Sequence, residues 1–244
     1  TAANNTAVGK SALGANTTGT GNTALGFQCG DALTTGNYNV AIGYDALSTN
    51  STGSACIAIG KEALKVNTSS NNTAVGRVAL TANTSGTYNT AIGDGSLSSN
   101  TTAANNTAVG HNAMVANTTG TVNVAVGSSA LAANTTASYN TAVGQSALSS
   151  NTTAAQNTGL GYAALTNATT GADNTATGSQ ALANTTTGAS NTAVGRSALQ
   201  LNTTGRDNTA VGYSAAATNT TGVENVSMGM YALRFNTTGG SNTA

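Results

Sequence analysis

The residues that could carry out chemistry are few in this chain of 244 residues. It contains one histidine, His111, so a Ser-His-acid triad or a histidine metal site would have to use that residue. His111 takes the repeat position that Lys10 and Tyr44 take elsewhere, with no second histidine and no nearby thiol in the sequence. This setting is typical of an exposed corner. We therefore predict that the chain is not an enzyme and has no catalytic residue, no metal ligand and no cofactor.

The two cysteines, Cys29 and Cys56, fall in different columns of the repeat and lie two repeats apart. If each repeat is one coil that rises about 4.8 Å, the two residues are about 10 Å or more apart. That separation exceeds the reach of a disulfide. We predict two free, buried thiols.

Charged residues are scarce and scattered. Seven basic and seven acidic residues make up 6% of the chain and cancel each other. This balance provides no basic surface for nucleic acid and no attraction to an anionic membrane. No run approaches the ~20 apolar residues of a membrane span. No carboxylate recurs in register, so neither a paired-acid site nor a calcium-binding repeat is expected.

One pattern repeats along the whole chain, beginning with NTAVGKSALGANTTGTG at Asn5, which we count as position 1. There are 14 complete repeats of the same length, except that the repeat starting at Cys56 is one residue shorter, and a fifteenth repeat starts at Asn242. Both ends fall inside a repeat, and capping repeats are missing. We predict that residues 1–244 form a single array, an excerpt of a longer fibre.

The first five positions predict a short strand that ends at a turn. Position 2 is Thr, Val or Ile in all 14 repeats, and position 4 is Val, Ile, Leu or Met in 13. Such side chains favour an extended backbone. Position 5 is glycine in all 14, which indicates a positive φ or a neighbouring backbone too close for a Cβ atom. The first members of this glycine column are Gly9, Gly26, Gly43 and Gly60.

The rest of the repeat predicts further turns. Position 9 is leucine in 11 repeats, and position 12 is asparagine in 11, followed by two Thr or Ser residues. Asn, Thr and Gly form turns, and the apolar positions lack the spacing of a helix face. We predict an all-β fold, a parallel β-solenoid with one 17-residue coil per repeat. Members of these two columns are Leu13, Leu47 and Leu64, and Asn16, Asn50 and Asn67.

In a stack of coils, identical residues lie above one another. The asparagines at position 12, and those at position 1 (Asn5, Asn22, Asn39 and Asn72), then either form ladders of amides or cap their own turns. We expect the leucine column and the aliphatic position 4 to fill the core. The alanine at position 3 of 12 repeats would face the other side of the strand, as a contact with another solenoid or as an exposed small-residue face.

Aromatic residues collect at the corner that follows the strand, at positions 6 and 7. There they could stack on sugars or grip a neighbouring molecule, although singly exposed aromatics are common on proteins. These candidate contact residues are Phe27, Tyr44, Tyr162, Tyr213 and Tyr231.

The stretches NTAVGKSAL, NVAIGYDAL and CIAIGKEAL resemble the xAIG coils in the heads of trimeric autotransporter adhesins and the similar repeats of phage tail fibres. The resemblance implies left-handed coils that pack as trimers and lie outside the cell, on a cell surface or a virion. It also implies an adhesive or spacer role, with any host-surface or glycan ligand held by a tip domain outside this chain. The coil here is longer than the usual adhesin coil, and no neck, stalk or membrane anchor is recognisable.

Two functions follow from these observations. The leading hypothesis is a passive structural segment of an extracellular fibre, assembled as a homo-oligomer, either a trimer or a filament. The alternative is an ice-binding β-solenoid that uses the Thr ladders of positions 13 and 14. Against the alternative, adjacent residues on a strand point in opposite directions, and the neighbouring Asn and Gly indicate a turn rather than a flat face.

Overall fold

The computed structural model describes residues 2–244, which form short strands joined by turns. Thr1, the first residue of the predicted array, lies outside the described residues. The chain separates into two compact units, Thr1–Val122 and Asn123–Ala244. No helix in the described part of the chain has the length and apolar character needed to cross a membrane.

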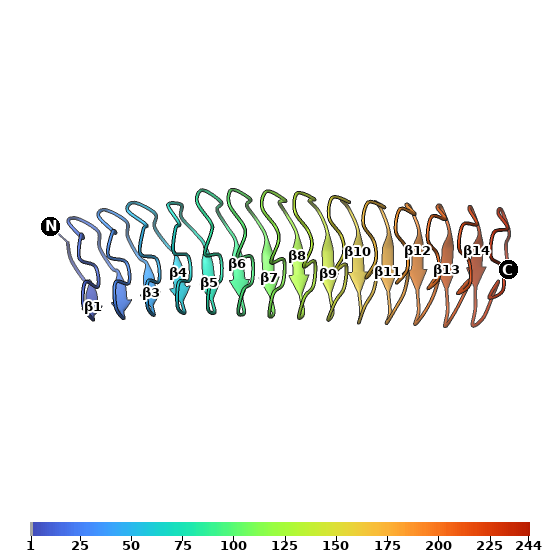
Figure 1. Ribbon diagram of the computed structural model, residues 1–244, viewed down its shortest axis with the longest axis horizontal. Helices are drawn as coiled ribbons and strands as arrows, with labels where there is room; N and C mark the ends of the chain where they lie inside the picture. Colours follow the sequence, from blue (N-terminus) through green and yellow to red (C-terminus); the bar gives the residue numbers. More distant parts are fainter. Residues whose placement is uncertain (1) are drawn as a thin grey trace. The chain divides into compact units, whose positions relative to one another are not determined.

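In the first unit, each of the first seven repeats contributes one three-residue strand from positions 2 to 4. Consecutive strands lie side by side, parallel and in register, so that Thr23 pairs with Val40 and Val40 with Ile57 (Figure 1). The step after Ile57 is one residue shorter, and Ile57 pairs with Thr73. The strands are β1 (Thr6–Val8), β2 (Thr23–Leu25), β3 (Val40–Ile42), β4 (Ile57–Ile59), β5 (Thr73–Val75), β6 (Thr90–Ile92) and β7 (Thr107–Val109).

The second unit repeats this arrangement. Thr158 pairs with Thr175, and Thr175 with Thr192, again parallel and one full repeat apart. Both units thus form the predicted all-β, parallel β-solenoid with one coil per repeat. The strands are β8 (Val124–Val126), β9 (Thr141–Val143), β10 (Thr158–Leu160), β11 (Thr175–Thr177), β12 (Thr192–Val194), β13 (Thr209–Val211) and β14 (Val226–Met228).

The interior of the coils differs from the prediction. The alanines at position 3, such as Ala58 and Ala142, are fully buried together with the leucine column. Aliphatic residues at position 4 face outward instead, and Ile92 and Val143 keep 40% and 37% of their surface exposed. The expectation that position 4 fills the core and position 3 forms an outer face was therefore wrong. A 17-residue coil encloses little space, so leucine on one wall leaves room only for alanine on the other.

The leucine column has an unusual backbone conformation. Leu148, Leu165 and Leu182 have φ values of 51°, 53° and 50°, in the left-handed region. Placing a residue other than glycine there costs about 1–2 kcal/mol. Burying a leucine side chain contributes about 1.5–3 kcal/mol. Burial offsets the backbone cost, which accounts for leucine rather than glycine at most of these positions.

The glycine column combines a positive φ with close approach of the next coil. Gly161 has a φ of 135°, and a Cβ atom added to it would lie 2.7 Å from both the carbonyl carbon and the carbonyl oxygen of Gly178. Side chains therefore cannot occupy position 5 without separating the coils. The predicted members Gly9, Gly26, Gly43 and Gly60 have φ values of 129°, 136°, 125° and 130°.

Candidate functional site

The asparagines at position 1 connect the coils through buried side-chain amides. Asn157 Oδ1 accepts a hydrogen bond of 2.9 Å from the backbone N–H of Asn174 in the next coil. Asn157 Nδ2 donates to the carbonyl of Gly171 in its own coil, also at 2.9 Å. Each amide therefore both joins neighbouring coils and closes its own turn. The predicted members Asn5, Asn22, Asn39 and Asn72 make the same pair of bonds.

The asparagines at position 12 form a second ladder. Asn100 Nδ2 donates to Asn83 Oδ1 at 2.8 Å, and Asn117 Nδ2 donates to Asn100 Oδ1 at 3.0 Å. Asn100 Nδ2 also donates to the Ala103 carbonyl of its own coil at 3.1 Å. The predicted members Asn50 and Asn67 are buried in this column. Both alternatives that the sequence left open therefore hold at once: each column forms a ladder between coils and caps its own turns, and the amides satisfy backbone groups that the turns would otherwise leave unpaired.

At two places a residue other than asparagine interrupts the second ladder, and each of these breaks leaves polar atoms unpaired. Each coil is numbered by the strand that it contains, so that coil 2 contains β2. In coil 2, position 12 is Leu33, and the amide of Asn16 in the preceding coil has no partner at Nδ2 or Oδ1. In coil 10, position 12 is Ala168, and Oδ1 of Asn151 in the preceding coil has no partner. A buried unpaired polar atom costs about 1–3 kcal/mol. Both breaks therefore weaken the stack locally.

The Leu33 break accompanies a change in the leucine column. Position 9 of coil 2 is Gly30, with a φ of 56°, so this coil avoids the backbone cost of a left-handed leucine. Leu33 is fully buried and supplies the apolar side chain that Gly30 lacks. Leu13, in the terminal coil, is only half-buried, whereas Leu47 and Leu64 are fully buried.

The shortened coil that starts at Cys56 contains a local rearrangement of the first ladder. Cys56 takes position 1, where the other complete repeats have asparagine. The Ser69 hydroxyl accepts a bond from Asn72 Nδ2 at 3.0 Å and donates to the Gly86 carbonyl at 2.6 Å, so the shortened turn remains bonded to the next coil. Cys29 and Cys56 are free and buried, as predicted, and burial raises the pKa of both thiols.

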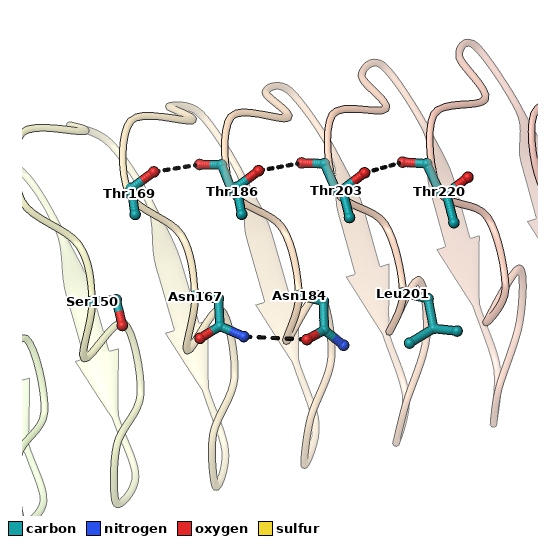
Figure 2. A pocket seen from close by; sticks show the side chains of 8 residues that line it. All are labelled: Ser150, Asn167, Thr169, Asn184, Thr186, Leu201, Thr203 and Thr220. Atoms are coloured by element: carbon teal, nitrogen blue, oxygen red, sulfur yellow. Dashed lines mark hydrogen bonds between the residues drawn. The ribbon is translucent and has the colours of Figure 1, made fainter.

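An open groove of about 640 Å³ follows the outside of coils 9 to 13 in the second unit (Figure 2). One wall is the row of position 13 threonines, and the other is the column of position 11 side chains. In coils 10 and 11 this second wall holds Asn167 and Asn184, and Asn167 Nδ2 donates to Asn184 Oδ1 at 3.2 Å. Ser150 and Leu201 continue the wall on either side.

The threonine row forms a third ladder. Thr169 Oγ1 donates to the Thr186 carbonyl at 3.1 Å, and Thr186 Oγ1 donates to the Thr203 carbonyl at 3.2 Å (Figure 2). Thr203 continues the row to Thr220 at 3.0 Å. Because these bonds use the hydroxyl protons, the oxygens keep their lone pairs as acceptors toward the groove.

The predicted corner aromatics are exposed, and several rings contact each other. Phe27 and Tyr44 stack with centroids 5.3 Å apart and 12° between their planes. Lys10 Nζ lies 5.9 Å from the Phe27 centroid, and Lys61 Nζ lies 5.8 Å from the Tyr44 centroid. These ring faces are therefore occupied by side chains of the same chain. In the second unit, Tyr213 meets Tyr231 edge to face at 5.4 Å, and Tyr162 is exposed.

The titratable residues lie apart from the groove lining. His111 is exposed at its corner, as predicted. Across residues 2–244 no three His, Cys, Asp or Glu side chains are placed to hold a metal ion. Lys65 Nζ lies 3.2 Å from Asp45 Oδ2, and this hydrogen bond raises the pKa of Lys65. Asp45 is less exposed than a free corner residue would be, because Lys65 lies against it.

Sequence reasoning missed the groove, although its signal was present. The segments TNATT in coil 10 and ANTTT in coil 11 carry asparagine one residue earlier than the usual column. Three further aromatic residues, Tyr38, Tyr88 and Tyr139 at position 17, are also exposed, Tyr38 by 71%, and were not among the predicted contact residues. A search for departures from the consensus, column by column, would have found both features.

Replacing Ala168 with asparagine should repair the second ladder. The new Nδ2 would donate to the unpaired Asn151 Oδ1, just as Asn151 Nδ2 donates to Asn134 Oδ1 at 3.0 Å. We expect the free energy of unfolding to rise by about 1–2 kcal/mol, measured by guanidinium chloride denaturation. Ala133→Asn, at the outward position 11, is the matched control and should change stability by less than about 0.5 kcal/mol. An Ala168→Asn variant no more stable than the parent would contradict the ladder argument.

No protein-family model matches this chain, and no curated protein matches it in sequence. The function of the chain must therefore be inferred from its coils and its surfaces.

Proposed function

We propose that this chain is a passive structural segment of an extracellular fibre, such as a surface adhesin, a surface filament or a phage tail fibre. The observation that supports it is the bonding between coils at four places in the repeat: the strand, the two amide ladders and the threonine row. A stack whose coils bond chiefly to their neighbours can be lengthened by adding coils. We assign it no catalytic role, no cofactor and no binding to nucleic acid.

The assembled form in this proposal is a trimer of left-handed coils, or a filament, joined through the outward face of the strands. This face carries position 2 and position 4 side chains, and no charged residue occurs at positions 1–5 of any repeat. In each unit, seven strands of three residues cover roughly 340 Å². The largest apolar patch on a monomer is typically about 300–600 Å² and often marks an interaction site. Here the position 4 row is aliphatic in 13 of the 14 complete repeats, whereas the position 2 row beside it is threonine in 10. A second copy offers the same uncharged face at the same coil spacing, so copies can pack coil against coil.

The mass of the particle in solution tests this proposal. Light scattering after size exclusion should give about three times the 23.5 kDa of one chain for a trimer, and a larger multiple for a filament. The double variant Val143→Lys/Val194→Lys places two charges on the outward face, and we expect it to reduce the mass to that of one chain because buried unpaired charges are costly. Ser128→Lys/Gln145→Lys places the same charges at exposed corners and should keep the parent mass. A monomeric parent, or a Val143→Lys/Val194→Lys variant that still assembles, would overturn this interface.

The competing function is ice binding. The observation that favours it is the outward position 2 column, which is threonine in 10 of the 14 complete repeats. The position 13 threonines are less suited to ice binding, because their hydroxyl groups donate hydrogen bonds to the next coil. A thermal-hysteresis assay separates the two functions. Hysteresis in the parent that Val143→Lys/Val194→Lys abolishes would favour ice binding, and no hysteresis in a monomeric parent would exclude it.

A further inference from the structure

We propose that the groove of coils 9 to 13 binds an uncharged, linear oligosaccharide. This goes beyond the structural role, because it gives one stretch of the array a ligand of its own. The groove lies on the turn side of the coil, away from the strand face assigned to assembly, so the two proposals can fail separately.

The first supporting observation is that the asparagine lies one position earlier in the repeat in two adjacent coils. Position 11 is asparagine in coils 10 and 11 and in no other repeat. Because the two coils are neighbours, Asn167 and Asn184 meet on the outside, with Asn167 Nδ2 donating to Asn184 Oδ1 at 3.2 Å. Asn184 Nδ2 donates in turn to the Gln200 carbonyl at 3.0 Å. These bonds hold two amides side by side in the wall of the groove (Figure 2).

The second observation is that this change weakens the interior. With Ala168 at position 12, the buried Asn151 Oδ1 has no partner. With Thr185 at position 12, the ladder is reduced to a 3.5 Å contact from Asn202 Nδ2 to Thr185 Oγ1. Stability by itself favours asparagine at position 12. Positions that break a local rule at a cost to stability are where functional sites are expected.

The third observation is the chemistry of the lining. The groove is formed by Ser, Asn, Thr and Leu side chains and contains no acidic or basic residue. Amides and threonine oxygens can exchange hydrogen bonds with sugar hydroxyls. Threonine methyl groups and Leu201 can cover the C–H faces of sugar rings. A charged ligand would lose hydration without gaining an opposite charge in the lining. The groove volume of about 640 Å³ lies within the range of ligand sites.

The groove also favours a linear ligand. Its lining groups recur once per coil, at about 4.8 Å. An extended oligosaccharide presents its hydroxyl groups at a comparably regular interval. Successive sugar units can therefore meet successive coils along the threonine row, from Thr169 to Thr220.

Isothermal titration calorimetry of the whole chain tests this site. The probes are three neutral hexasaccharides, cellohexaose, mannohexaose and fully N-acetylated chitohexaose, and one charged hexasaccharide of galacturonic acid. We expect at least one neutral probe to bind and the charged probe not to bind. Asn167→Ala/Asn184→Ala should weaken the neutral interaction by about tenfold or more, because two hydrogen-bonding groups are lost. Ser99→Ala, at position 11 of coil 6 and outside the groove, should bind as the parent does.

A second variant separates binding from folding. Asn167→Ala/Ala168→Asn returns one asparagine to position 12, in the second ladder. This variant should therefore resist denaturant better than the parent, while its affinity for the neutral probe should fall by about tenfold or more. Binding that survives both asparagine variants would place the ligand elsewhere and overturn the proposal. Failure of all neutral probes, or equal binding of the galacturonic acid probe, would also overturn it. None of these results depends on whether the chain is a trimer.

Discussion

Gly161→Ala should lower the free energy of unfolding by about 3 kcal/mol or more. Two effects add at this position. The φ of 135° is a conformation that side-chain-bearing residues rarely adopt, and the new Cβ would lie 2.7 Å from the carbonyl of Gly178. That contact is with backbone, so no side chain can rotate away to relieve it. The coil containing β10 would have to separate from the coil containing β11, and their strand pairing would be lost.

Gly159→Ala provides a control within the same strand. Gly159 occupies position 3, where 12 other repeats have alanine. A Cβ there would lie 3.3 Å from the Ala164 carbonyl oxygen and 3.4 Å from the Leu148 side chain, distances that small shifts can accommodate. We expect this variant to be more stable than the parent by about 0.4–1 kcal/mol, because alanine restricts the unfolded chain.

Guanidinium chloride denaturation compares the two glycine variants, and hydrogen exchange locates the effect. In a repeat array each coil depends mainly on its neighbours, so protection should fall first around β10 and β11 in the Gly161→Ala variant. Equal effects of the two substitutions, in either direction, would show that the glycine column does not set the coil spacing.

Asn157→Ala should lower the free energy of unfolding by about 2–6 kcal/mol. The substitution removes the acceptor of the Asn174 N–H bond and the donor to the Gly171 carbonyl, both at 2.9 Å. Two buried backbone groups are then left unpaired, at about 1–3 kcal/mol each. Water cannot easily replace the amide, because Asn157 and Asn174 are fully buried.

The matched control is Asn167→Ala, the same chemical change on the outside of the same coil. Asn167 is exposed, and its hydrogen bond to Asn184 Oδ1 lies in the open groove, where water can substitute. We expect this variant to change stability by less than about 0.5 kcal/mol. Denaturation curves for the two variants should thus separate clearly. Similar midpoints would mean that the buried amides contribute little beyond filling space.

The large cost expected for the amide ladder explains how the stack holds together with little apolar material. Each coil buries one leucine and two alanines in most repeats, which is a thin core. Hydrogen bonds between coils therefore have to supply the specificity of stacking. Asparagine suits this task because its amide donates and accepts at once and carries no charge to desolvate.

The sequence by itself determined the repeat, a short strand before the position 5 glycine, the turns and the glycine column. It also indicated that the asparagine columns stack, because identical residues at a fixed period must stack when coils stack, but it left open whether the amides form ladders or cap their own turns. These features depend on local conformational preference and on the repeat period, and both are evident in the amino-acid sequence. The free state of Cys29 and Cys56 followed in the same way, from the spacing of the coils.

Only the tertiary structure decided which side of the strand faces inward. Alternation along Thr-Ala-Val shows that the two faces of the strand differ. The larger aliphatic side chains at position 4 predicted that this face lies in the core. Because the interior of the coil is small, the alanine at position 3 faces inward instead. The groove was missed for the same reason. Whether position 11 or position 12 faces outward depends on how the turn folds back on the coil. The position of Asn167 and Asn184 in the groove therefore follows only from the three-dimensional path of the coil.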